Sequence, residues 1–209
     1  MKKFLVILLS LLLALSFSLF IGCKKVEKPA EAPKAPAPKE VTEVEGTDDR
    51  FQKAHTFSLK KDLKAATSEI RKSAELIKQE AEKATEEGKK ALTASVNELG
   101  KLAKDVEKGT VTSEKTMKDV FARAEHALAN HRYLKVSEQW AKKESKETGH
   151  ALKNAALHME QAAKWVGREL ETGTVDVING TRLVAGKLIE GAGWVTEKVG
   201  KGITAIDRC

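Results

Sequence analysis

Small and apolar residues recur at alternating spacings of three and four in the first half of the chain. They are Ile70, Ala74, Ile77, Ala81, Ala84, Gly88, Ala91, Ser95, Leu99, Leu102 and Val106. This spacing places them all on one stripe of an α-helix, in the phase of a heptad seam. The pattern predicts one helix over about residues 57–108, continuous through Gly88 because that glycine lies on the seam.

A second seam follows a predicted stop at Lys108-Gly109, where glycine ends the first helix. Its positions are Met117, Val120, Ala124, Ala127, His131, Leu134, Glu138, Ala141, Ser145, Thr148, Leu152, Ala155, Met159, Ala162 and Val166. We expect a helix over about residues 113–171. The stretch from His131 to Thr148 is polar, which leaves open a break near Gly149, although the unbroken phase favours continuity.

The third predicted helix, about residues 175–206, is rich in glycine. Gly186, Gly193 and Gly200 are seven residues apart and share one stripe. Each interior glycine weakens a helix by about 1 kcal/mol relative to Ala. We therefore expect close docking against an Ala-rich helix, with a membrane-surface helix as the alternative. Antiparallel pairing about Gly173-Thr174 would bring Ile189 near His158 and Trp194 near Lys153.

Residues 51–209 contain no proline, the residue that most often breaks helices. The chain has 32% charged and 5% aromatic residues, a balance typical of long helices. These features predict an all-α protein whose body is an elongated antiparallel bundle or coiled coil of about three long helices.

The first residues have the pattern of a secretory signal. Lys2 and Lys3 precede an apolar run from Phe4 to Ile21, which ends at Gly22-Cys23. Leu19-Phe20-Ile21-Gly22-Cys23 resembles the lipobox of bacterial lipoproteins, with Phe20 where that family usually has Leu. The resemblance implies that residues 1–22 are removed and that Cys23 carries acyl chains, palmitate among them. The alternative is an uncleaved membrane anchor, since 17 to 25 apolar residues span a bilayer.

All four prolines of the chain lie in the segment that follows, residues 23–50. A segment rich in Pro, Ala, Lys and Glu with little to bury predicts a disordered, semi-rigid tether. Residues 51–209 then form the helical body, for which no family resemblance is found. In a Gram-negative envelope, Lys24 after the Cys favours the periplasmic side of the outer membrane. In another host the outer face of the plasma membrane is expected.

Few residues suggest metal or cofactor chemistry. Glu147 and His150 form a single Glu-x-x-His motif, which di-iron bundles use twice. His131 on the second seam is a candidate metal or haem ligand. The alternative is a polar core layer that fixes helix register, in which His131 lies level with Lys89 and Lys90, and Glu138 pairs with Lys83. No cofactor is expected.

The sequence contains no catalytic triad, phosphate loop or dinucleotide motif, so we expect no enzyme. The formal charge of +7 would suit nucleic acid, but an exported protein does not meet it, so we expect no nucleic-acid partner. The expected partners are the membrane, an envelope protein, anionic lipid or cell-wall polymer. The predicted function is a lipid-anchored scaffold, spacer or adaptor, with a metal-, haem- or lipid-binding bundle or a stress holdase as alternatives. Cys209, the remaining thiol after acylation of Cys23, would be free or form an intermolecular bridge.

Overall fold

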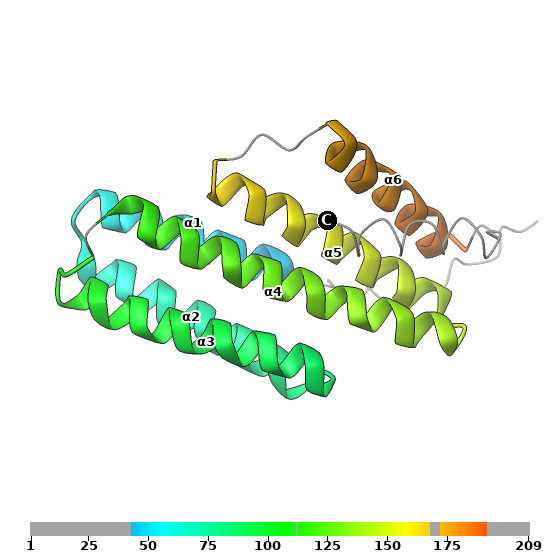
Figure 1. Ribbon diagram of the computed structural model, residues 1–209, viewed down its shortest axis with the longest axis horizontal. Coiled ribbons are helices and arrows are strands. Elements are labelled where there is room, and N and C mark those ends of the chain that lie inside the picture. The colour runs from blue at the N-terminus through cyan, green and yellow to red at the C-terminus, as the bar shows by residue number, and fades with distance from the viewer. Residues whose placement is uncertain (1–42, 112, 168–171, 192–209) are drawn as a thin grey trace, which may run out of the picture. The chain divides into compact units, whose positions relative to one another are not determined.

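The computed structural model describes residues 43–111, 113–167 and 172–191, in which there are six helices and no strand (Figure 1). They are α1 (Glu43–Leu59), α2 (Leu63–Glu82), α3 (Glu86–Glu107), α4 (Glu114–Ala141), α5 (Ser145–Trp165) and α6 (Thr172–Ile189). The all-α class is confirmed for these residues. The predicted signal, Cys23, Cys209 and most of the predicted tether lie outside them, although α1 begins inside the range assigned to the tether.

The prediction of three long helices is wrong, and the first seam shows why. It covers two antiparallel helices, α2 and α3, which pack on each other and are joined at Lys83-Ala84-Thr85. Thr85 caps α3 by accepting a hydrogen bond from the Gly88 amide, and Glu86 and Glu87 occupy its first turn. Gly88 therefore lies in the first turn of a new helix rather than within a continuous one.

Two further helix ends are formed by lysine pairs. Lys61 and Lys143 both have φ of 61°, the left-handed conformation that glycine usually supplies after a helix. In each case the next residue, Asp62 or Glu144, donates its amide to a carbonyl five residues earlier. The break in the second predicted helix is therefore at Lys142–Glu144 and not at Gly149, which lies inside α5.

The hairpin of α5 and α6 has a different register from the expected one. α5 ends at Trp165 and α6 begins at Thr172, so the turn is centred several residues before Gly173. As a result Ile189 lies against Gly149 rather than near His158. Gly193, Gly200 and Trp194 are outside the described residues, and a methyl group built on Gly186 would meet nothing within 4 Å. Gly186 therefore docks against no helix of residues 43–111, 113–167 and 172–191.

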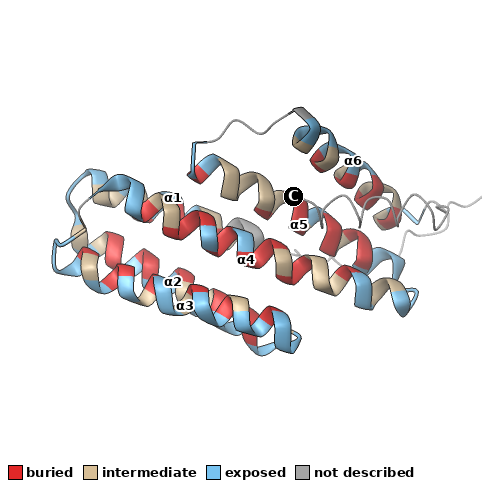
Figure 2. Ribbon diagram, viewed as in Figure 1, coloured by how far each residue is buried: buried red, intermediate tan, exposed pale blue. Residues whose placement is uncertain are grey.

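The buried apolar residues form two cores. Figure 2 marks the buried positions along the helices. The main core joins α1 to α4 and the end of α5, with Phe51 stacked on Phe121 at 4.3 Å and Trp165 edge-on to both. The second core joins the end of α4 and the start of α5 to α6. It consists of Val136, Ala151, Leu152, Val184, Ala185 and Leu188, with Trp140 at its edge.

Within the described ranges, none of the helices combines the length and apolar character needed to cross a bilayer.

Candidate functional site

A group of polar side chains lies between four helices, all of them buried except the half-buried Asp48, and we call it the polar layer. α1 contributes two members, α2 one, α4 three and α5 one. They are Thr47, Asp48, Glu80, Glu125, His131, Arg132 and His158. Buried ionisable groups are rare unless paired, so this layer is the strongest candidate for a site with special chemistry in the described part of the chain.

One half of the layer joins α2 to α4. Glu80 Oε2 lies 2.8 Å from Arg132 Nη2 and 3.5 Å from His131 Nε2. The side chains of Glu80 and Arg132 are only 6% and 9% exposed. Lys83 Nζ, which is near the surface, lies 3.2 Å from the other carboxylate oxygen of Glu80. Glu80 is thus surrounded by cationic and imidazole groups from two helices.

The other half joins α4 to α5. His158 Nδ1 lies 2.5 Å from Glu125 Oε2, and the two side chains are 1% and 0% exposed. Burial raises the pKa of Glu125 because the carboxylate loses its hydration, while the hydrogen bond and charge of His158 oppose that shift. Glu125 can therefore hold a proton at a higher pH than an exposed carboxyl would.

α1 completes the layer from the side. Burial raises the pKa of Asp48, and the indole of Trp165 together with the charges of Lys164 and His158 partly opposes it. Thr47, one residue earlier, is buried. The charges of Asp48 and Glu125 also act on each other, which adds to the raised pKa of Glu125.

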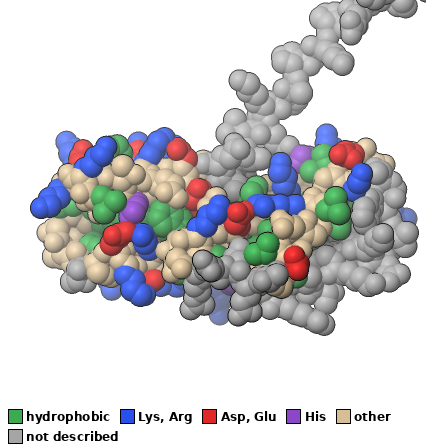
Figure 3. Space-filling view, turned by 90° about the horizontal axis from the view of Figure 1, so that it is seen from above, with side chains coloured by type: hydrophobic (Ala, Val, Ile, Leu, Met, Phe, Trp, Pro, Cys, Tyr) green, Lys and Arg blue, Asp and Glu red, His purple; other side chains and the backbone are tan. Residues whose placement is uncertain are grey.

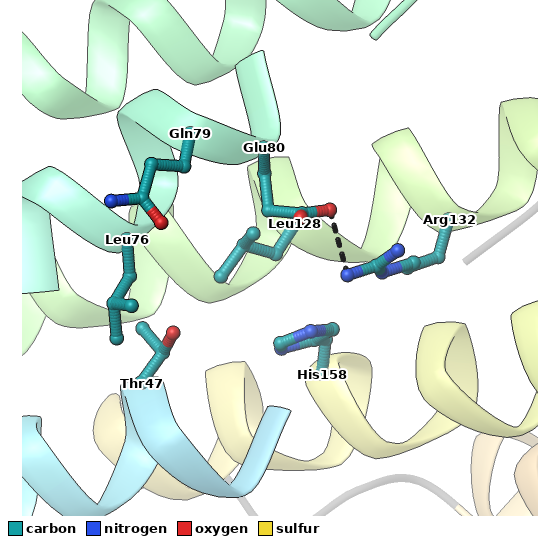
Figure 4. A pocket seen from close by; sticks show the side chains of 7 residues that line it. All are labelled: Thr47, Leu76, Gln79, Glu80, Leu128, Arg132 and His158. Carbon is teal, nitrogen blue, oxygen red and sulfur yellow. Dashed lines mark ion pairs between the residues drawn. The ribbon is translucent and has the colours of Figure 1, made fainter. Parts of the chain in front are cut away.

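A small cavity of about 20 Å³ lies within the layer (Figure 4). Leu76, Gln79 and Leu128 line it together with Thr47, Glu80, Arg132 and His158. His158 Nε2 has no hydrogen-bond partner among the described residues, and a space of this size holds about one water molecule. The guanidinium of Arg132 at its wall opposes a metal cation. No three His, Cys, Asp or Glu side chains of the described residues are placed to bind one.

Of the three residues assigned to a polar layer from the sequence, His131, Glu138 and Lys83, the structure places only His131 in the layer described above. His131 is buried beside Gly88, close to the level of Lys89 and Lys90 that the sequence indicated. Glu138 instead points to solvent and pairs with Lys142 on its own helix at 2.6 Å. Lys83 ends α2 and approaches Glu80. The expected Glu138–Lys83 pair fails because the helix breaks at Lys83, which α3 does not include.

The candidate metal ligands are not gathered into one group. Glu147 is exposed on the first turn of α5, His150 is half-buried on the same helix, and His131 lies in the layer on α4.

The sequence contains a signal for the members that we missed. Residues Phe121, Glu125, Leu128, Arg132 and Val136 repeat at spacings of four and three, and all are buried. They form a second stripe on α4, beside the seam that includes His131. A helix buried on two faces requires partners on both sides, which α3 and α5 supply.

A larger cleft of about 440 Å³ lies where α1 passes into α2 and α3 into α4. Its lining includes Leu63, Val106 and Met117, and His55 Nε2 pairs there with Glu114 Oε1 at 2.9 Å. Lys118 and then His55 hold the pKa of Glu114 below its usual range. The imidazole of His55 and the carboxylate of Glu114 in this cleft are therefore already paired with each other.

Comparison of the chain with protein-family models, curated proteins and solved structures gives no match.

Proposed function

We propose that the chain is an exported lipoprotein whose helical body acts as a scaffold or adaptor at a membrane surface. The observation that carries this proposal is Leu19–Cys23, a lipobox-like sequence that follows a charged start and an apolar run. Acyl chains on Cys23 would hold the protein to a bilayer, since two or more chains anchor stably where one is marginal.

The position of the first helix supports this arrangement. α1 begins at Glu43, which is 43 − 23 = 20 residues after Cys23. An extended Pro-rich linker covers about 3 Å per residue, so a tether of this length would reach roughly 60 Å. The body would then be free to meet a partner at some distance from the lipid surface.

The surface of the body also supports a binding role over a catalytic one. Figure 3 shows Lys and Arg mixed with Asp and Glu over the visible face. Many of these residues pair along one helix, as in Lys53–Asp49 and Lys115–Asp119. The unusual ionisable groups are instead buried in the polar layer, where they join helices. A cavity of about 20 Å³ there is far smaller than a haem or an acyl chain.

Intact mass of the membrane-extracted protein tests the proposal. The expected species lacks residues 1–22 and carries added acyl mass on Cys23. The control is Cys23→Ser, which should remain unprocessed and lose that mass while the circular dichroism of the body stays the same. A wild-type species that retains residues 1–22 with an unmodified thiol would contradict the proposal.

An adaptor should also have a protein partner at the membrane. Crosslinking in intact cells, followed by purification, should recover one partner protein reproducibly with wild type. Less of that partner should be recovered with Cys23→Ser. Equal recovery with both forms would contradict a role that depends on membrane attachment.

A further inference from the structure

The packing of α6 is set apart from the rest of the body. Its buried residues are Ile178, Thr181, Val184, Ala185 and Leu188. Three of them belong to the second core, which contains six buried residues, whereas the main core contains nineteen. α6 therefore packs into the smaller of the two cores, with α5 as its principal partner.

The polar layer separates the two cores. On α4, His131 and Arg132 lie between Leu128 of the main core and Val136 of the second. On α5, His158 lies between Trp165 of the main core and Leu152 of the second. The buried apolar residues in these intervals are alanines, Ala129 on α4 and Ala155 and Ala156 on α5. The two cores are therefore joined there only through small side chains. Because cooperativity in folding depends on shared buried contacts, this limits the coupling between the two cores.

α6 also has little stability of its own. A methyl group built on Gly173, Gly180 or Gly186 would meet nothing within 4 Å among the described residues, so none of these glycines serves a close helix contact there. Each of these glycines lowers the equilibrium constant for helix formation roughly fivefold relative to Ala. Leu183 on this helix is 61% exposed and adds little burial.

The close contact between α5 and α6 depends on one glycine of α5. A methyl group built on Gly149 would lie 2.8 Å from the backbone oxygen of Ala185 and 2.8 Å from Ile189 Cγ1. Backbone cannot move aside as a flexible side chain can. Any side chain at position 149 therefore forces α6 away from α5.

We propose that α6 is a detachable latch. By this we mean that α6 separates from α4 and α5 as one helix, while the bundle of α1 to α5 stays folded. Its departure uncovers an apolar strip on the two helices, formed by Val136, Ala151 and Leu152. Four features support this proposal. They are the small second core, the polar layer between the cores, the glycines of α6 and the close contact of α6 with Gly149. It does not depend on lipidation of Cys23.

Hydrogen exchange of the whole protein, read by mass spectrometry, tests the proposal. Amides in the middle of α6 should show an open population at least tenfold larger than that of amides in α3, because α3 packs in the main core. Peptides from α3 serve as the internal reference in every sample. Equal protection of α6 and α3 would overturn the proposal.

Two matched Gly→Ala variants sharpen the test, because both raise helix propensity by the same amount. Gly149→Ala should speed exchange in α6 at least tenfold and leave α3 unchanged, since the new methyl group meets the α6 backbone. Gly180→Ala should slow exchange in α6 about fivefold and also leave α3 unchanged, since the methyl group meets open space.

The overturning results are specific to each variant. If Gly149→Ala speeds exchange in α3 and α6 alike, α6 opens only with the whole body. If Gly149→Ala fails to fold, Gly180→Ala decides alone, and equal slowing of α3 and α6 would refute a separate latch.

Discussion

Replacing Glu80 by Gln should destabilise the bundle, because it removes the buried carboxylate that lies against Arg132. The substitution keeps the size of the side chain and its position on α2. What it removes is the negative charge 2.8 Å from Arg132 Nη2 and 3.5 Å from His131 Nε2. The variant thus tests the polar layer as an electrostatic unit rather than as packed volume.

The magnitude follows from burial and distance. Two unit charges about 2.8 Å apart attract by roughly 6 kcal/mol at an effective dielectric constant of about 20, before desolvation is subtracted. Breaking a buried pair by removing one partner costs about 3 to 5 kcal/mol. We expect about 3 kcal/mol for Glu80→Gln, the low end of that range, because the adjoining cavity holds about one water that can hydrate Arg132.

Urea unfolding followed by circular dichroism measures this loss. With a slope of about 2 kcal/mol per molar urea, a loss of about 3 kcal/mol lowers the midpoint by about 1.5 M. Glu138→Gln is the matched control, since Glu138 also pairs with a cation but is 49% exposed. That variant should leave the midpoint unchanged within error.

A double variant separates the cost of removing one charge of the Glu80–Arg132 pair from loss of packing. Glu80→Leu combined with Arg132→Met removes both charges and keeps apolar volume, so it should cost less than about 1 kcal/mol. A Glu80→Gln loss under about 1 kcal/mol, or a double variant less stable than the single one, would refute the electrostatic argument.

Three further predictions follow from the packing, the turns and the raised pKa values. Phe121→Ala should cost about 3 to 5 kcal/mol in urea unfolding, because Phe121 is fully buried on Phe51; a loss below about 1 kcal/mol would contradict the described core. Lys143→Gly should raise stability by up to about 1 kcal/mol, since glycine adopts the left-handed conformation of Lys143 without steric cost. An equal gain from Lys153→Gly inside α5 would contradict that reason. Burial raises the pKa of Glu125 above its usual 4.5, so above that pH the native state binds more protons than the unfolded state. The stability of wild type relative to Glu125→Gln should therefore fall as the pH rises toward neutral. A stability difference that stays constant with pH would contradict the raised pKa.

The sequence predicted burial along the helices better than it predicted their ends. Of the first seam, Ile70, Ile77, Leu99, Leu102 and Val106 are all buried. The seam is real because each helix buries one stripe, and periodicity reports that stripe directly. Whether the stripe belongs to one helix or to two antiparallel ones is a different question, which periodicity alone does not answer.

The members of the polar layer could be predicted only in part. His131 was found because it falls on the main seam of α4, whereas Glu125 and Arg132 fall on the second stripe of that helix. A search for one apolar face per helix treats such residues as solvated surface. Glu80 and His158 were missed for another reason: their burial depends on which helices meet, and the assumption of three helices gave the wrong partners.

The missed helix ends have a common physical cause. Gly109 was recognised as a stop because glycine adopts positive φ without a steric cost, and its φ is indeed 67°. Lys61 and Lys143 adopt nearly the same φ, although a side chain there costs about 1 to 2 kcal/mol. Tertiary packing must outweigh that cost, because α1 pairs with α2, and α4 with α5, only if the chain reverses at these points. The residues of a turn therefore determine the conformational cost of the turn. The burial gained between the flanking helices determines whether the turn forms.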